Sequence, residues 1–367
     1  MRIYYQPNGG LGAVPEITEL GTIKVFGCTA WQDYADGKVL FARIPNAPMV
    51  FAREIEAFRP DVVVVETFTP SMVLALSKVR QFYVGAIVGM WGDTVNRNSF
   101  EILRRCGRYL DALYILDKRS EAGLQALGVP SHFTVLPAMS LYKHDPSTSK
   151  IYDVVFAGNI CTESRGFVES DLDQRLELIR AFAARPGFAL FGGEGWKKYS
   201  LPVKGWVNEY ELAKVYNQAK IVLASDKFLH LPGFTSNRTH KALLCGVLVL
   251  IRRFAGIEEL FTNGRELVWF DSVEEALSLV DYYLAHEDER YRIATAGMEW
   301  ASRHARVREL FKRWIDVAPR GSYPAGARDE ASAHLWRLYF LARKVAIRLG
   351  LETGILPRGW LHWRNSP

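Results

Sequence analysis

The feature that most constrains the fold is an alternation of short apolar segments with longer amphipathic ones, which runs through the chain twice. The short segments are rich in Val, Ile, Tyr and Phe and are apolar throughout, which is typical of strands buried on both faces of a parallel sheet. The longer segments repeat their apolar residues at helical spacing. This alternation predicts βαβ units and a doubly wound sheet.

A polar, turn-rich stretch at 143–151 (KHDPSTSKI) separates two halves of similar size. In the first half we expect strands at 2–6, 22–27, 61–66, 83–88, 112–116 and 133–136, and helices at 49–58, 71–79, 98–105 and 119–127. In the second half we expect strands at 153–157, 189–191, 221–224, 247–251 and 267–270, and helices at 172–184, 209–218, 237–244, 273–285 and 288–304. We therefore predict an α/β protein with Rossmann-like domains at 1–145 and 151–305 that face each other across a cleft, followed by a C-terminal helical tail at 306–367.

Composition and net charge limit the kinds of binding partner that we expect. The 367 residues are 49% hydrophobic and 23% charged, as in an ordinary globular protein. The net charge of +6 suits phosphates or an anionic surface, but no nucleic-acid-binding signature occurs, so no nucleic acid partner is expected. We expect free thiols in a reducing compartment, because the cysteines are widely spaced at Cys28, Cys106, Cys161 and Cys245. With no signal peptide and no membrane-spanning run, the expected location is the cytoplasm.

The tail leaves a peripheral membrane contact open. Residues 330–349 read as a helix in which Arg337, Lys344 and Arg348 share one narrow face and apolar residues cover much of the rest. Such a helix can lie in a membrane interface. It can equally pack against the N-terminal domain with its basic stripe in solvent.

The segment 233–246 (GFTSNRTHKALLCG) is the most informative for function. Thr235 and Ser236 are good N-cap residues for the helix that follows, and a helix start binds phosphate through its open N–H groups and its dipole. Arg238 in the first turn adds a charged contact to a diphosphate, and Lys241 lies three residues on. The alternative is an ordinary capped helix with two solvated cations.

Glycine-containing turns follow expected strands in both halves. In the second half, the turns FAGN (156–159), FGGEGW (191–196) and KGWV (204–207) let a ligand approach the backbone, and Trp206 can stack on a nucleobase. In the first half, NGGLG (8–12) is either a phosphate cradle or a plain tight turn. Asp93, in the WGD loop, binds acceptor hydroxyls, acts as a base, or simply caps a helix.

From about residue 153 to residue 304 the chain resembles the CgeB-like glycosyltransferases, a branch of the GT-B enzymes. The resemblance rests on motifs that occur in order: DVVFAGN, LDQRLELI with Arg175 opening a helix, FGGEGW, KGWVNEYELAKVYNQAKIVLASD, SNRTHKALLCGVLVLIRRFAGIEELFTNGRELVWF and LAHEDERYRIATAGMEW. The first half shows only a generic match to an acceptor domain.

The resemblance implies transfer of a sugar from a nucleotide-diphosphate sugar to a saccharide, a glycolipid or another lipid-linked acceptor. It implies retention of anomeric configuration, no essential metal and no cofactor beyond the UDP-, GDP- or dTDP-sugar donor. The expected catalytic residues are Arg238, Lys241 and Asp93. The expected donor-binding residues are Gly9, Gly10, Gly158, Asn159, Gly192, Gly193, Gly205, Trp206, Val207, Gly233, Phe234, Thr235, Ser236 and Asn237.

One departure from the family concerns position 241. Many relatives place a ribose-binding glutamate before the ALxCG stretch, where this chain has Lys241, and the earlier acid of the related E-x7-E pattern falls at Gly233. Either the ribose contact comes from elsewhere or the donor pose differs. Two other functions therefore stay open, a nucleotide-sugar epimerase on the same scaffold and a non-catalytic nucleotide-sugar-binding protein.

Overall fold

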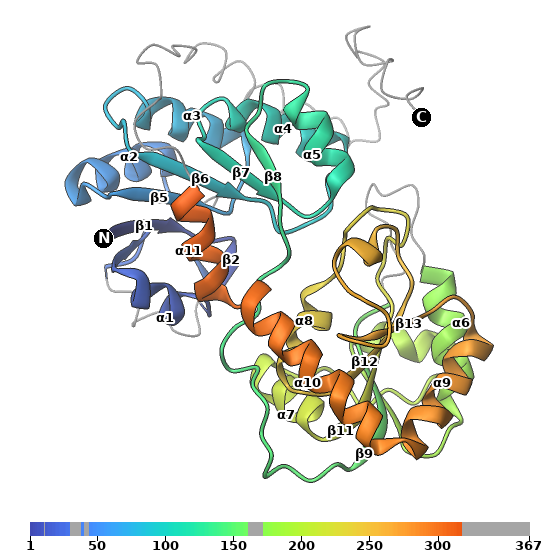
Figure 1. Cartoon of the computed structure of the whole chain (residues 1–367). Coiled ribbons are helices and arrows are strands. Elements are labelled where there is room, and N and C mark those ends of the chain that lie inside the picture. The colour runs from blue at the N-terminus through green and yellow to red at the C-terminus, as the bar shows by residue number, and fades with distance from the viewer. Residues whose placement is uncertain (11, 30–37, 40–43, 161–171, 318–367) are drawn as a thin grey trace, which may run out of the picture.

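The computed structural model describes residues 1–10, 12–29, 38–39, 44–160 and 172–317. Two parallel sheets, one in each half of the chain, confirm the predicted α/β architecture with two Rossmann-like domains. Figure 1 shows them as two lobes, the first in blue to teal and the second in green to orange. The helix expected at 330–349 and Cys161 lie outside the described residues.

The N-terminal sheet has six parallel strands in the order β3-β1-β5-β6-β7-β8. They are β1 (Arg2–Gln6), β3 (Thr22–Val25), β5 (Val62–Val65), β6 (Ala86–Met90), β7 (Ala112–Ile115) and β8 (Ser131–Phe133). The helices of this half are α1 (Val14–Ile17), α2 (Ala47–Phe58), α3 (Pro70–Val79), α4 (Arg97–Gly107) and α5 (Lys118–Gln125). A short antiparallel pair joins β2 (Gly9–Gly10) to β4 (Lys38–Val39).

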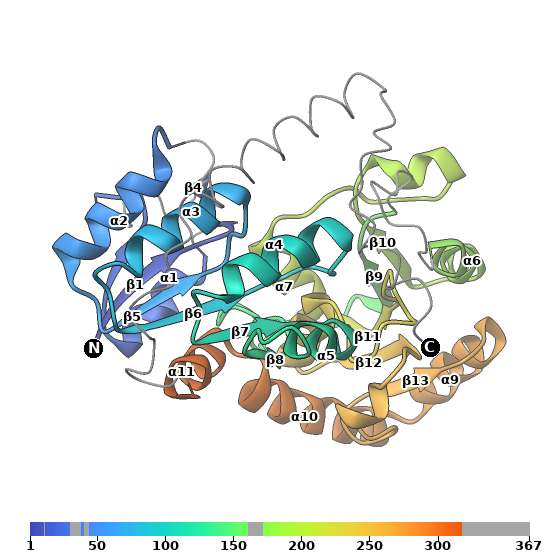
Figure 2. The ribbon, with the colours of Figure 1, turned by 90° about the horizontal axis from the view of Figure 1, so that it is seen from above.

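The C-terminal sheet has five parallel strands in the order β10-β9-β11-β12-β13. They are β9 (Tyr152–Ala157), β10 (Phe188–Phe191), β11 (Ala219–Ala224), β12 (Leu248–Arg252) and β13 (Val268–Phe270). The α-helices are α6 (Leu172–Ala183), α7 (Glu209–Asn217), α8 (Asn237–Leu244), α9 (Val273–Ala285) and α10 (Glu287–His304). Figure 2 shows α6, α7, α9 and α10 from above. Every strand and helix expected in the two halves is present, with ends within a few residues.

Local sequence explains where helices begin. The Thr69 hydroxyl accepts from the Met72 N–H at the start of α3, and Asp117 accepts from the Ser120 N–H at the start of α5. Asn208 opens α7 with a capping box. These side chains satisfy N–H groups that the helix itself leaves without a partner, so each fixes a strand-to-helix turn.

Each sheet reverses its strand order once. In the N-terminal sheet the chain moves from β1 to β3 on one side and then to β5 on the other. In the C-terminal sheet it moves from β9 to β10 and then to β11. A crevice opens outside the carboxyl ends of the strands at such a point, so the loops after β1 and β5 and those after β9 and β11 are the places for ligands.

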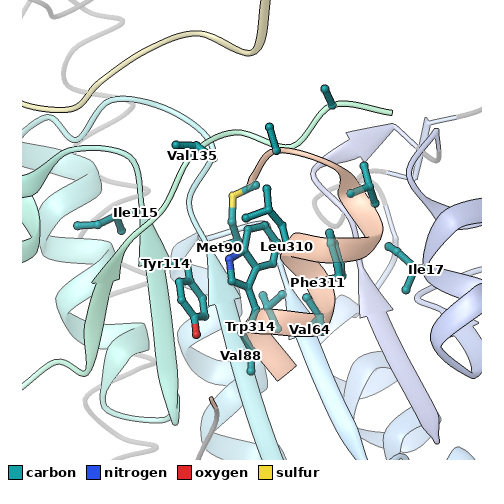
Figure 3. Packing of buried hydrophobic residues seen from close by; sticks show 14 of the residues in the cluster. Ile17, Val64, Val88, Met90, Tyr114, Ile115, Val135, Leu310, Phe311 and Trp314 are labelled. Atoms are coloured by element: carbon teal, nitrogen blue, oxygen red, sulfur yellow. The ribbon is translucent and has the colours of Figure 1, made fainter. Parts of the chain in front are cut away.

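A final described helix, α11 (Val307–Val317), returns to the N-terminal sheet. Phe311 and Trp314 are both buried. The Phe311 ring contacts Tyr5 of β1 with centroids 5.6 Å apart, and the Trp314 ring stacks on Tyr114 of β7 with centroids 5.4 Å apart (Figure 3). The Trp314 indole N–H also donates to the Thr134 hydroxyl at 3.2 Å. The range 306–367 was predicted as one tail, and its first part is a helix in the core of the first lobe.

The loop 227–236, which lies in the connection from β11 to α8, contacts both lobes. A small apolar cluster joins them and comprises Leu116, Phe228, Leu231 and Phe234, with Leu136 packed against it. The Lys118 N–H donates to the Pro232 carbonyl at 3.1 Å, and His240 Nδ1 lies 2.9 Å from the Leu136 carbonyl. The carboxyl edge of the N-terminal sheet, at the end of β7, therefore meets the loop that leads into α8.

Two further expectations concern cysteines and membranes. Cys28, Cys106 and Cys245 are free thiols and all are buried. Burial raises the pKa of the Cys245 thiol to about 12. Of the helices that the structure describes, none is both long and apolar enough to cross a membrane.

Candidate functional site

A pocket lies at the reversal point of the C-terminal sheet. It lies between the ends of β9 and β11 and the start of α8 and is partly open to solvent. Its lining consists of Phe156, Ala157, Tyr216, Val222, Leu223, Ala224, Ser225, Asp226, Ser236 and Arg238.

The start of α8 closes one side of the pocket. Ser236 is the N-cap residue, yet its hydroxyl makes no capping bond to the helix. Its backbone N–H donates to Asp226 Oδ1 at 3.2 Å, which ties the helix start to the loop after β11. The first turn of α8 therefore faces the pocket without an internal cap, as in helix ends that bind anions.

Arg238 stands in this first turn. Its guanidinium makes no hydrogen bond or ion pair with any part of the chain that the structure describes. A Cβ atom built on Gly158 would lie 3.5 Å from Arg238 Cζ, at van der Waals distance, so the guanidinium lies beside the end of β9. An unneutralised arginine at a helix N-terminus attracts a phosphate through both its charge and its donor geometry.

Glycines after β9 and β10 form an edge that follows the pocket residue Ala157, although they do not line the pocket themselves. Gly192 approaches Gly158 so closely that a Cβ atom would come within 2.2 Å of the Gly158 carbonyl oxygen. The Asn159 side chain accepts from the Gly193 N–H at 2.6 Å, which holds the two turns together. The structure thus brings four of the expected donor-binding residues to one edge.

The loop after β10 extends this edge. Gly205 has φ of +111°, a conformation that favours glycine, and its carbonyl accepts from the Gly192 N–H at 2.9 Å. Trp206 is 71% exposed, so its indole face is open to solvent next to the glycine edge. Val207 packs against the core instead.

The segment before α8 has a different role from the one expected. Gly233 faces the N-terminal domain, because a Cβ atom there would come within 2.8 Å of the Phe133 ring. Phe234 lies in the apolar cluster between the lobes, and Thr235 is buried with its hydroxyl 3.4 Å from that of Thr239. None of the three lines the pocket. Asn237 begins α8 but is not among the lining residues either.

Lys241 is a correction to the expected catalytic set. Its side chain is only 7% exposed, and its ammonium bonds both carboxylate oxygens of Glu209, at 2.7 and 3.0 Å. Burial lowers the pKa of Lys241 and Glu209 acts in the opposite direction. Its charge is already matched within the protein, and it does not line the pocket, whereas Arg238 does.

Two residues of the pocket floor were missed by the sequence analysis. Ser225 and Asp226 directly follow β11 and are 3% and 2% exposed. Within the part of the chain that the structure describes, the Ser225 hydroxyl and Asp226 Oδ2 have no hydrogen-bond partner, although buried polar atoms are nearly always paired. The signal for them is their position directly after an apolar strand at the point where the strand order reverses.

The expected N-terminal residues lie at the carboxyl edge of the first sheet. Asp93 is exposed and accepts from the Thr94 N–H at 2.7 Å, a local turn contact. Gly9 and Gly10 form the short strand β2. Glu66, which sequence analysis missed, ends β5 and accepts from the Asn8 N–H at 3.3 Å. Burial raises the pKa of Glu66 to about 7.

Among the described residues, no group of three or more His, Cys, Asp or Glu side chains is arranged to hold a metal ion. Positive charge near the pocket comes from the guanidinium of Arg238, from the start of α8 and from the buried guanidinium of Arg175, which donates to the carbonyls of Asn159 and Ser225 at 2.9 and 2.6 Å.

Known proteins with the same arrangement define the fold. HepE from Anabaena, crystallised with UDP-glucose, has a TM-score of 0.60 at 14% identity, covering 86% of this chain and 98% of HepE. A glycosyltransferase from Rickettsia africae ESF-5 has a TM-score of 0.60 at 10% identity, covering 86% and 97%. Sucrose-phosphate synthase from Thermosynechococcus elongatus has a TM-score of 0.58 at 11% identity, covering 93% and 100%. The fold is that of the GT-B glycosyltransferases.

A match to a family model adds evidence from the sequence to that from the fold. Residues 174–316 match the family model described as glycosyl transferase-like, and this range contains Arg238 and most of the pocket. No curated protein sequence matches the chain. The matched domain and the two-lobed fold together define an enzyme of the glycosyltransferase class.

Proposed function

We propose that this protein transfers a sugar from a UDP-sugar to a hydroxyl group of a saccharide or lipid-linked acceptor. The observation that carries the proposal is Arg238, an arginine at the start of α8 that lines the pocket and has no partner among the described residues. Structures of similar fold contain UDP-glucose in HepE, and UDP in TarM from Staphylococcus aureus, which has a TM-score of 0.52.

The chemistry requires stabilisation of the negative charge that develops on the departing diphosphate. The Arg238 guanidinium and the first N–H groups of α8 supply fixed positive charge at one place, so transfer proceeds without an essential metal or other cofactor. We propose retention of anomeric configuration and membership of the CgeB-like branch, on the order of the motifs between 153 and 304.

The acceptor side is assigned to the carboxyl edge of the N-terminal sheet. Its loops carry Glu66 and Asp93, and its β7 end adjoins the loop before α8 through the Lys118–Pro232 hydrogen bond. The basic, apolar pattern at 330–349 favours a lipid-linked acceptor at the inner face of a membrane.

Titration calorimetry with UDP, GDP and dTDP tests the donor assignment, and we expect UDP to bind. Incubation with labelled UDP-sugars, with and without an extracted glycolipid acceptor, then separates the functions. Acceptor-dependent release of UDP supports transfer, whereas isomerisation of the donor alone indicates an epimerase. Absence of any nucleotide binding indicates a non-catalytic protein.

Two further measurements test the mechanism. Activity abolished by EDTA contradicts the metal-free mechanism. The coupling constant of the anomeric proton in the product shows whether the configuration is retained.

A further inference from the structure

The surroundings of Glu209 carry an inference beyond the pyrophosphate contact. Glu209 is the first residue of α7, whose start is fixed by the capping box between Asn208 and Glu211. Its carboxylate accepts from Lys241 at both oxygens, and Oε2 also accepts from the Tyr142 hydroxyl. Lys241 and Tyr142 are both buried, so Glu209 is held from the protein side in one position.

The other side of this carboxylate is open. The Glu209 side chain is 47% exposed, while its partner Lys241 is 7% exposed. A carboxylate oxygen accepts about two hydrogen bonds. Oε2 already accepts from Lys241 and Tyr142, whereas among the described residues Oε1 accepts only from Lys241, at 3.0 Å. Oε1 therefore retains a position for one more donor, on the exposed side.

The location of Glu209 identifies that donor. Trp206, whose indole face is open, lies three residues before Glu209 in the same loop. Arg238 lies about one helical turn before Lys241 on α8, and Lys241 bonds Glu209. Glu209 thus follows a surface suited to a nucleobase along the chain. It also adjoins the pocket that holds the guanidinium, because Tyr142, which bonds Glu209, contacts the pocket residue Tyr216 with ring centroids 6.5 Å apart. In a nucleoside diphosphate the group between base and diphosphate is the ribose, whose hydroxyls are hydrogen-bond donors.

We propose that Glu209, positioned by Lys241 and Tyr142, accepts a hydrogen bond from a ribose hydroxyl of the bound nucleotide. This inference rests on the proposed function, because it requires a nucleoside diphosphate in the pocket. It gives Lys241 a positioning role: the ammonium neutralises and orients a carboxylate that binds the neutral, sugar part of the nucleotide, away from the diphosphate.

The test is a binding cycle by titration calorimetry with UDP, 2′-deoxy-UDP and 3′-deoxy-UDP. A hydrogen bond to a charged group contributes about 1.5–3 kcal/mol, so wild-type protein should lose about tenfold or more in affinity when the contacted hydroxyl is missing. The double variant Glu209→Leu with Lys241→Met removes both charges, so no buried ammonium stays unpaired. In this variant the affinity ratio of UDP to the deoxynucleotide should fall to about twofold or less.

Glu211→Gln is the matched control, because glutamine also completes a capping box and Glu211 does not bond Lys241. It should keep the wild-type ratio, and thermal unfolding verifies that both variants are folded. An equal ratio in the wild type and the double variant overturns the role of Glu209 while leaving the proposed function in place. No loss from either missing hydroxyl in the wild type does the same. No UDP binding by the wild type overturns both.

Discussion

At the scale of single residues, Arg238 differs from the other cations around the pocket. Lys241 is neutralised by Glu209, and Arg175 donates to the carbonyls of Asn159 and Ser225, whereas the Arg238 guanidinium has no hydrogen bond or ion pair within the described structure. A charge without an internal partner contributes little to folding, so its substitution separates function from stability.

Arg238→Ala should lower kcat by about a hundredfold or more, because one donor to a developing charge is removed. The same variant should weaken UDP binding and change the free energy of unfolding by less than about 0.5 kcal/mol. Steady-state kinetics, calorimetry and urea unfolding measure the three effects. Arg292→Ala is the control, since Arg292 is exposed on α10 and pairs only with Glu289 of the same helix. Unchanged UDP affinity in Arg238→Ala contradicts the site.

A second residue-scale prediction concerns pH. Burial lowers the pKa of His240 from 6.5 to about 4, so the unfolded state takes up the proton first as pH falls. Stability attributable to His240 is complete above about pH 6.5 and is lost between there and pH 4, by about 3 kcal/mol. Glu66 acts oppositely, because a pKa raised from 4.5 to about 7 makes stability fall as pH rises through that window.

His240→Asn keeps a donor for the Leu136 carbonyl but cannot titrate. Relative to wild type, it should lose less stability between pH 7 and pH 5. Glu66→Gln should shift the profile the other way, with stability rising more steeply as pH rises from 4.5 to 7. Urea unfolding of the three proteins at several pH values checks the signs, and parallel profiles would rule out both assignments.

At the scale of elements, α11 is the helix that sequence analysis did not place. Its residues Leu310, Phe311 and Trp314 are buried against strands that lie far earlier in the chain (Figure 3). Helical periodicity shows that a segment is amphipathic, but not which surface receives its apolar face. The strands and helices of the two halves were predictable because each carries its own local pattern and cap.

The residues of the candidate site also fall into two groups, those that local sequence indicates and those that only the tertiary structure brings together. Gly158, Gly192 and Arg238 were predictable, because each lies at the end of a strand or the start of a helix. The Lys241–Glu209 pair was not, since it joins α8 to α7 through side chains 32 positions apart. The same holds for Phe234, whose partner Leu116 belongs to the other lobe.

Trp314→Ala tests the role of α11. Loss of a buried Trp costs about 3–5 kcal/mol, and Trp314 also donates a hydrogen bond to Thr134. Thermal unfolding should show a lower Tm, while UDP affinity measured well below that temperature should stay within about twofold, because the pocket is in the other lobe. Lys312→Ala, on the exposed side of α11, should leave Tm close to wild type. Equal Tm values for the two variants would contradict this packing.

At the scale of the whole molecule, the loop 227–236 performs two tasks. Leu231 and Phe234 pack in the apolar cluster between the lobes. Ser236, the last residue of the loop, lines the pocket. The relative position of the lobes and the start of α8 are thus set by the same loop.

Phe234→Ala should loosen the contact between the lobes without removing a pocket-lining group. We expect kcat to fall by about tenfold, because transfer requires donor and acceptor in register, and UDP affinity to change by less than about twofold. Small-angle X-ray scattering should show a larger radius of gyration. Val84→Ala, an exposed residue of the first lobe, is the control. A large loss of UDP affinity in Phe234→Ala would instead place Phe234 at the donor, as the sequence analysis expected.

The return of α11 to the first lobe has a consequence for synthesis. A ribosome finishes β5, β6 and β7 before it makes any of the second lobe, and it makes Phe311 and Trp314 only after that lobe is complete. The nascent first lobe emerges with an uncovered apolar surface, the condition in which chains associate wrongly or recruit chaperones. Cutting the gene between the halves would therefore yield one fragment that lacks part of its own interior.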